Sequence, residues 1–206
     1  HKEYRRQRQM CKETAVRPDD LKGPIAESLR SLELGGNRLR SMENLGHLAH
    51  LEELWVGKNK ITSLNVRIRG PLASADQLQY IDTLSNLRVL SIQSNRLTDL
   101  SGLQSLTNLE ELYVAHNGIT SLAGLENNTK LNTLDITGNR VESLEGIAHL
   151  SEMNQFWASD NQIKDINHLD LYLGPKLMPK LETIYLEGNP VPVSYTHLRA
   201  HETRHD

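Results

Sequence analysis

Residues 109–119 read LEELYVAHNGI, and this stretch decides the fold. Apolar side chains occupy its first, fourth, sixth and eleventh positions, and Asn117 occupies the ninth. The frame occurs seven times along the chain when other apolar residues are allowed at the leucine positions, with starts 22, 36, 22, 22, 22 and 28 residues apart. The copies begin at Leu29, Leu51, Leu87, Leu109, Leu131, Met153 and Leu181, and their ninth residues are Asn37, Asn59, Asn95, Asn117, Asn139, Asn161 and Asn189.

The spacing within the frame predicts how each unit folds. In its fourth to sixth residues two apolar side chains flank one exposed residue, which is the alternation of a short strand with one buried face. The asparagine amide can satisfy backbone groups that are buried at the following bend. Apolar residues three apart on the return path, such as Leu100, Leu103 and Leu106, suit 3₁₀ turns better than a long helix.

This pattern is the leucine-rich-repeat signature, and it predicts an α/β repeat solenoid. We expect a horseshoe with a parallel concave sheet, strands centred on the fifth position of each repeat, and a mostly 3₁₀ or irregular convex side. The composition agrees, because 34 of the 206 residues are leucine and 16 are asparagine. No single repeat contains a core, so stacking of the repeats must create one.

Charge and composition narrow the function. The chain has 23 Lys and Arg against 26 Asp and Glu, a net charge of −3, which argues against nucleic acid or an anionic membrane as the main partner. No apolar run is long enough to span a bilayer. The single cysteine, Cys11, allows no intrachain disulfide and favours a reducing compartment. Outside residues 193–206 no Gly-rich phosphate loop, no Ser or Cys elbow and no metal-ligand cluster is evident, so we expect no enzyme, no cofactor and no metal.

Three segments depart from the repeat. Residues 1–28 show no frame, and we expect a disordered or non-native end there, with a nucleic-acid or membrane arm as the minority interpretation of its basic start. Removing residues 66–79 restores an ordinary repeat, so they are a loop insertion or a retained intron. Residues 193–206 carry His197, His201 and His205 at a helical spacing that could bind zinc. However, they read as a translated sequencing adapter, so we expect an artefact tail and a repeat domain at 29–192.

The fifth position of each repeat is expected to face the concave side. Four of the nine aromatic residues, both tryptophans among them, lie in these seven positions, far more than an even distribution would place there. Trp and Tyr are frequent hot-spot residues in interfaces, so the column predicts a binding surface. The alternative is that the rings stack on their neighbours and cover the sheet. The column is Glu33, Trp55, Ser91, Tyr113, Asp135, Trp157 and Tyr185.

Acidic residues accompany the rings. The third, fifth, seventh and eighth positions together hold six acids and one base, while the tenth position forms a basic column on one flank. The concave face therefore suits a partner with basic and apolar features rather than a nucleic-acid backbone. The acids are Glu33, Glu53, Glu111, Asp135, Asp160 and Glu187, the base is Lys58, and the basic column is Arg38, Lys60, Arg96 and Arg140.

The 22-residue spacing and the run AHNGITSLAGLENNTKLNTLDITGNRVESLEGIAHL, with FWASDNQI and LETIYLEGNP, resemble the regulatory subunit 7 family of protein phosphatase 1 over residues 29–192, less the insertion. The resemblance implies a non-catalytic regulator that binds the catalytic subunit of protein phosphatase 1 through its concave face, in the nucleus and cytoplasm, and is otherwise monomeric. It also implies a fragment without the family's first repeats and C-terminal cap.

The family's contact residues carry over where the frame matches. Glu33, Trp55, Asp135, Trp157 and Tyr185 match contacts in kind, and Gln155 stands where the family has a glutamate. Tyr113 joins them as a member of the aromatic column. The alternative function is that of another intracellular leucine-rich-repeat adaptor, in an axonemal or splicing assembly.

Overall fold

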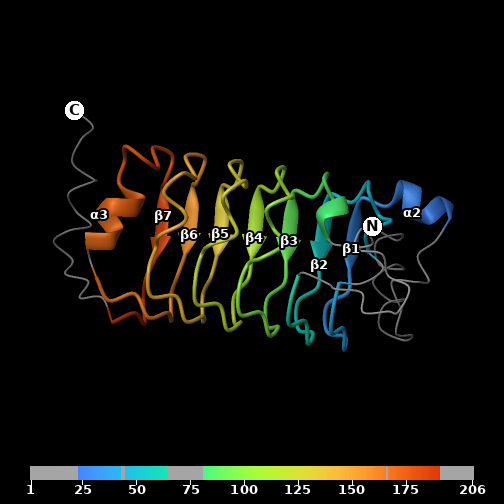
Figure 1. The fold of residues 1–206 in the computed structure, drawn as a ribbon, viewed down its shortest axis with the longest axis horizontal. Coiled ribbons are helices and arrows are strands. Elements are labelled where there is room, and N and C mark those ends of the chain that lie inside the picture. The colour runs from blue at the N-terminus through green and yellow to red at the C-terminus, as the bar shows by residue number, and fades with distance from the viewer. Residues whose placement is uncertain (1–22, 43–44, 65–80, 166, 191–206) are drawn as a thin grey trace, which may run out of the picture.

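The computed structural model describes residues 23–42, 45–64, 81–165 and 167–190. In this part of the chain seven short strands form one parallel sheet in chain order (Figure 1). The register pairs equivalent positions of successive repeats, for example Leu54 with Leu90 and Leu112 with Leu134. The predicted solenoid is thus confirmed. The strands are β1 (Ser31–Glu33), β2 (Glu53–Trp55), β3 (Val89–Ser91), β4 (Glu111–Tyr113), β5 (Thr133–Asp135), β6 (Gln155–Trp157) and β7 (Thr183–Tyr185).

Each strand covers the third to fifth positions of its repeat, so it is centred one residue earlier than the sequence predicted. The ladder starts where the third-position N–H donates to the preceding repeat, as from Glu53 to the carbonyl of Arg30 at 2.9 Å. The extended run ends soon afterwards because the eighth residue has a positive φ in all seven repeats. These residues are Gly36, Lys58, Ser94, His116, Gly138, Asp160 and Gly188. A left-handed residue turns the chain out of the sheet.

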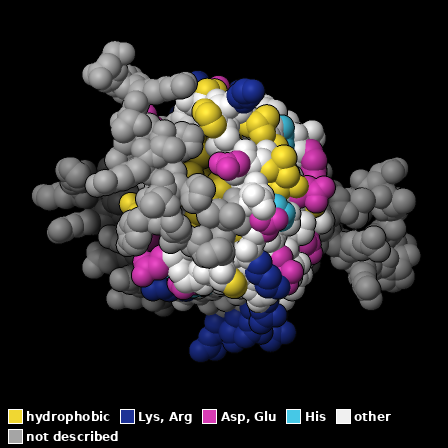
Figure 2. All heavy atoms as spheres, turned by 90° about the vertical axis from the view of Figure 1, so that its left-hand side faces the viewer, with side chains coloured by type: hydrophobic (Ala, Val, Ile, Leu, Met, Phe, Trp, Pro, Cys, Tyr) yellow, Lys and Arg dark blue, Asp and Glu magenta, His cyan; other side chains and the backbone are white. Residues whose placement is uncertain are grey.

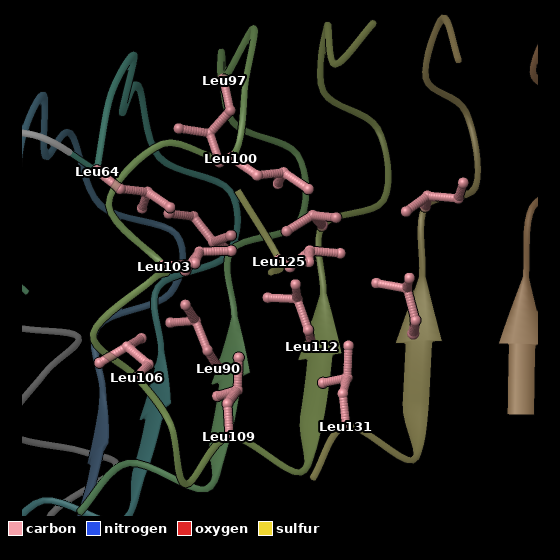
Figure 3. Packing of buried hydrophobic residues seen from close by; sticks show 14 of the residues in the cluster. Leu64, Leu90, Leu97, Leu100, Leu103, Leu106, Leu109, Leu112, Leu125 and Leu131 are labelled. Atoms are coloured by element: carbon pink, nitrogen blue, oxygen red, sulfur yellow. The ribbon is translucent and has the colours of Figure 1, made fainter. Parts of the chain in front are cut away.

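The core lies between the sheet and the return path. Leucines from the strands, such as Leu90 and Leu112, point toward leucines of the return path, such as Leu103 (Figure 3), and all three are fully buried. On that path the N–H groups of Leu103, Leu106 and Leu109 each donate to the carbonyl three residues earlier, at 3.0–3.3 Å. These bonds are the 3₁₀-type turns that the spacing predicted. Burying one leucine stabilises the fold by about 1.5–3 kcal/mol, and only stacking achieves it.

The ninth-position asparagines form a ladder that joins neighbouring repeats. Asn161 shows the pattern. Its Nδ2 donates to the carbonyl of Ile136 in the preceding repeat at 2.9 Å and to two carbonyls of its own repeat, while its Oδ1 accepts from the N–H of Val141 at 3.0 Å. The equivalent residues from Asn59 to Asn189 bond in the same way. The side chain thus gives the N–H of Val141 its acceptor, and it shares the carbonyls at the bend with other donors, such as the N–H of Gly138 at Ser159.

Two short α-helices lie at opposite ends of the sheet (Figure 1). Helix α2 (Pro24–Ser28), inside the segment that showed no repeat frame, places Ala26 in the core. Helix α3 (Asn167–Leu173) lies in the longer repeat before β7, and the 3₁₀ helix η2 (Ile81–Thr83) precedes β3. The expected insertion at 66–79 and tail at 193–206 lie outside the described residues, as does most of the segment 1–28.

Candidate protein-binding surface

The fifth-position side chains, from Glu33 to Tyr185, form a single column across the sheet. We call the face that carries this column the sheet face; the sequence predicted that it would be concave. The register runs without a break from Glu33 beside Trp55 to Trp157 beside Tyr185. Six of the seven predicted contact residues therefore share this column. Gln155 lies in the neighbouring third-position column, on β6, and is half-buried.

Rings on alternate strands lean toward one another along the column. Strands two apart in a sheet are separated by roughly 9–10 Å. The ring centroids of Trp55 and Tyr113 are nevertheless only 6.1 Å apart, with a 21° interplanar angle, and those of Tyr113 and Trp157 are 6.3 Å apart. The rings therefore cover the small residues between them, Ser91 and Asp135, which are only 5% and 6% exposed.

The last two rings occupy adjacent strands at the C-terminal end of the column. The centroids of Trp157 and Tyr185 are 6.2 Å apart in an edge-to-face arrangement, which is a favourable geometry for aromatic pairs. Tyr185 remains 56% exposed, whereas Trp157 is half-buried. Figure 2 looks at the β7 end of the solenoid and shows exposed hydrophobic side chains close to a group of acidic ones. The rings thus both stack and offer apolar surface to solvent.

Third-position glutamates hold two of the rings in place. The hydroxyl of Tyr113 donates to Glu111 Oε2 at 2.7 Å, and Trp55 Nε1 donates to Glu53 Oε2 at 3.4 Å. Burial, and then the bond to Glu111, raises the pKa of the Tyr113 phenol well above its usual value, so it remains a donor. A partner cation approaching these strands would meet an aromatic face and a fixed carboxylate together.

Asp135 differs from the expectation of an exposed acidic contact. Tyr113 and Trp157 lie on either side of it in the column, and its Oδ1 accepts from the N–H of Thr137 at 3.0 Å. The indole Nε1 of Trp157 is buried and has no hydrogen-bond partner among the described residues. Within the isolated chain, Asp135 therefore supports the aromatic column more than it presents a charge to solvent.

The sequence predicted the column and offered ring stacking as the alternative to a binding surface, and the stacking is observed. It did not indicate that rings two strands apart would touch. The alternation of large and small residues along it was the available signal. A ring needs room to lean, and Ser91 and Asp135 provide that room between Trp55 and Trp157. The ring-to-glutamate bonds within single strands have a sequence signal too, because Glu precedes the ring by two residues in β2 and β4.

A polar hollow of about 420 Å³ lies beside the start of the strands, away from the aromatic column. Its lining charges are paired with each other: Arg30 lies 3.6 Å from Glu52, and Arg88 makes two bonds to Glu110 at 2.7 and 3.0 Å. These pairs compensate the charge that would attract a ligand. The sheet face, by contrast, offers rings and carboxylates to a partner, so it is the better candidate.

Within the described ranges, no group of three or more His, Cys, Asp or Glu residues is arranged to hold a metal ion. No helix in that part of the chain is long and apolar enough to cross a membrane. The three tail histidines lie outside the described residues.

The family Leucine Rich repeats (2 copies) matches residues 27–74, 85–127 and 107–149. The chain therefore belongs to the leucine-rich-repeat family, and it has the architecture of a protein-binding scaffold, a fold that is typically non-catalytic.

Known proteins resemble the chain to different extents. It is 56% identical over 39 residues to the Protein phosphatase 1 regulatory inhibitor subunit PPP1R7 homolog of Arabidopsis thaliana, a match spanning 19% of this chain and 12% of that protein. The solved internalin InlF of Listeria monocytogenes has a TM-score of 0.63 and 23% identity, covering 91% of this chain and 56% of that one. Internalin C2 of the same organism has a TM-score of 0.57 and 28% identity, covering 86% of this chain and 77% of that one. The solved structures support the fold.

Proposed function

We propose that this chain is a non-catalytic regulatory scaffold that binds the catalytic subunit of protein phosphatase 1 through its sheet face, in the nucleus and cytoplasm. The observation that carries the proposal is the aromatic column bordered by glutamates, because it combines apolar area and negative charge on one surface. The 39-residue match to the plant PPP1R7 homolog supports the choice of partner.

The geometry explains how such a surface would bind. The ring of Tyr185 already packs against Trp157. A partner that covers this ring would remove apolar area from water at a low cost in side-chain entropy, because the ring is already held in place. Glu53 and Glu111 are held by hydrogen bonds to rings and would receive basic side chains of the partner. Gln155 continues the third-position column without a charge.

The sharpest test compares two side chains of similar exposure on different faces. Tyr185 on the sheet face is 56% exposed, and Leu171 on helix α3 is 59% exposed. Tyr185→Ala should weaken binding to the catalytic subunit, measured by titration calorimetry, by about thirtyfold or more, whereas Leu171→Ala should leave it unchanged. Equal affinities of Tyr185→Ala and the parent would exclude this face. A parent chain that does not bind the subunit would favour a different adaptor role.

Trp157→Ala provides a second, independent test. It removes the ring that contacts both Tyr113 and Tyr185, so we expect a loss of affinity at least as large as for Tyr185→Ala. Because the truncation also uncovers Asp135, circular dichroism must show that the variant remains folded. Arg96→Ala, in the tenth-position column, should change affinity by less than about 1 kcal/mol.

A further inference from the structure

One rung of the asparagine ladder differs chemically from the others. Asn117 is followed by Gly118, whereas the other ninth-position asparagines precede Arg, Lys, Gln or Pro. In an Asn-Gly pair the backbone nitrogen that follows asparagine can approach the side-chain amide most easily, because glycine has no Cβ in the way. We propose that Asn117-Gly118 is a deamidation site that the folded repeat protects, and that deamidation there makes opening of the solenoid between β3 and β4 irreversible.

The reaction needs only water and balances as follows. The nitrogen of Gly118 loses its proton and attacks Cγ of Asn117, which closes a five-membered succinimide ring. The Nδ2 nitrogen of Asn117 takes up a proton and leaves as ammonia. Water then opens the ring at either carbonyl and gives aspartate or isoaspartate. One water is consumed, one ammonia is released, and nothing is oxidised or reduced.

The folded repeat restrains both reacting groups. The Nδ2 of Asn117 donates to three backbone carbonyls at 2.9–3.2 Å, and one of these carbonyls belongs to Ile92 in the preceding repeat. Its Oδ1 accepts from the N–H of Leu97 at 3.0 Å. The attacking nitrogen, that of Gly118, donates to the carbonyl of Leu97 at 2.7 Å. Because Ile92 and Leu97 belong to the repeat that contains β3, the attack requires the two repeats to separate.

The product cannot restore the rung. A carboxylate has no N–H to donate, so three carbonyls lose a donor and a negative charge faces their oxygens instead. Isoaspartate additionally lengthens the backbone by one atom. The reacted chain should therefore stay open beside β4 and part the aromatic column between Trp55 and Tyr113. The inference depends on the asparagine ladder alone and not on the partner proposed above.

The first experiment measures the reaction in the full chain. The protein is incubated at one mildly alkaline pH in buffer and in unfolding urea, and peptide mapping by mass spectrometry locates the product. We expect deamidation at Asn117 in urea and a rate at least about a hundredfold lower in buffer, since opening of a central repeat is rare. Gly118→Gln, which places there the residue that follows Asn161, should abolish the reaction at Asn117 in urea. Equal rates in buffer and urea, or an unchanged rate in the variant, would overturn the proposal.

The second experiment tests whether the modification prevents closure. Asn117→Asp produces the aspartate product directly, and Asn127→Asp is the matched control because its exposed amide makes a single bond, to the carbonyl of Gln104 at 3.0 Å. Asn117→Asp should lose cooperative thermal unfolding or unfold at a clearly lower temperature, while Asn127→Asp should unfold like the parent. If the two variants have the same midpoint, deamidation does not fix the open state and the proposal fails.

Discussion

An interior rung of the asparagine ladder should contribute several times more stability than a terminal rung, and Asn161→Ala compared with Asn37→Ala measures the difference. In Asn161→Ala the N–H of Val141 loses its partner, the Oδ1 of Asn161, at a cost of about 1–3 kcal/mol for a buried donor. The three carbonyls that Asn161 serves each keep another donor; that of Ile136, for example, still accepts from Asn139. Losing these three bonds adds about 0.5 kcal/mol each.

The sum for Asn161→Ala is therefore about 2.5–4.5 kcal/mol. Asn37 bonds only within its own repeat among the described residues, to the carbonyls of Leu34 at 2.9 Å and Gly35 at 3.5 Å. Its loss should cost less than about 1 kcal/mol, because the Leu34 carbonyl keeps the donor from Asn59.

Urea denaturation followed by circular dichroism provides the measurement, with the m-value fitted for each variant to detect a change from two-state behaviour. The free energy of unfolding should be highest for the parent, lower for Asn37→Ala and lowest for Asn161→Ala, with a gap of at least about 1.5 kcal/mol between the two variants. A gap below about 1 kcal/mol would show that the hydrogen bonds between repeats are not what the ladder contributes.

Three further predictions concern the turns and the polar contacts. Gly124→Ala should lower the free energy of unfolding in urea by more than about 2 kcal/mol, and Gly36→Ala should lower it by about 1 kcal/mol. Both glycines have a positive φ, but of the two only Gly124 would place a Cβ against the backbone of the preceding repeat, 2.7 Å from the carbonyl oxygen of Leu100. In a spectrophotometric titration one tyrosine should ionise above the ordinary pKa of 10.0, and this late transition should be absent in Tyr113→Phe. Because the pKa is raised in the folded state, the stability that the neutral Tyr113 phenol contributes is present below pH 10.0 and is lost as the pH rises through the folded pKa. The hydrogen bonds from Arg88 hold the pKa of the Glu110 carboxyl below 4.5. The parent should therefore be more stable than Glu110→Gln near neutral pH, and this advantage should be lost as the pH falls through the lowered pKa and should shrink in high salt. Urea midpoints measured against pH provide the test.

The sequence was sufficient to predict the sheet, its order and the return path. A frame that recurs seven times removes the ambiguity of any single three-residue strand. Equivalent positions of the frame pair even where the step is 36 or 28 residues, so the frame sets the register. The spacing of three between Leu100, Leu103 and Leu106 likewise predicted the observed turns, because it determines which N–H can reach which carbonyl. These features follow from the spacing of residues along the chain, and this spacing can be read from the sequence.

Lateral contacts between repeats were less accessible. The burial of Asp135 results from rings on the two neighbouring strands, so the residue alone gave no sign of it. The left-handed conformation of Lys58 and His116 is visible only by comparison with Gly36 and Gly138 at the same position of other repeats. In both cases the information lies across the stack, between residues that are 22 or more positions apart.

The same lateral contacts connect the stability of the chain to its proposed binding surface. The asparagine ladder fixes the register of neighbouring repeats, and that register sets which rings can touch. Trp55 and Tyr113 stack only because β2, β3 and β4 stay in line, with Ser91 between the two rings. The aromatic column is therefore a property of the stack and not of any one repeat. A substitution at Asn117, which lies outside the column, should consequently weaken partner binding by separating its rings.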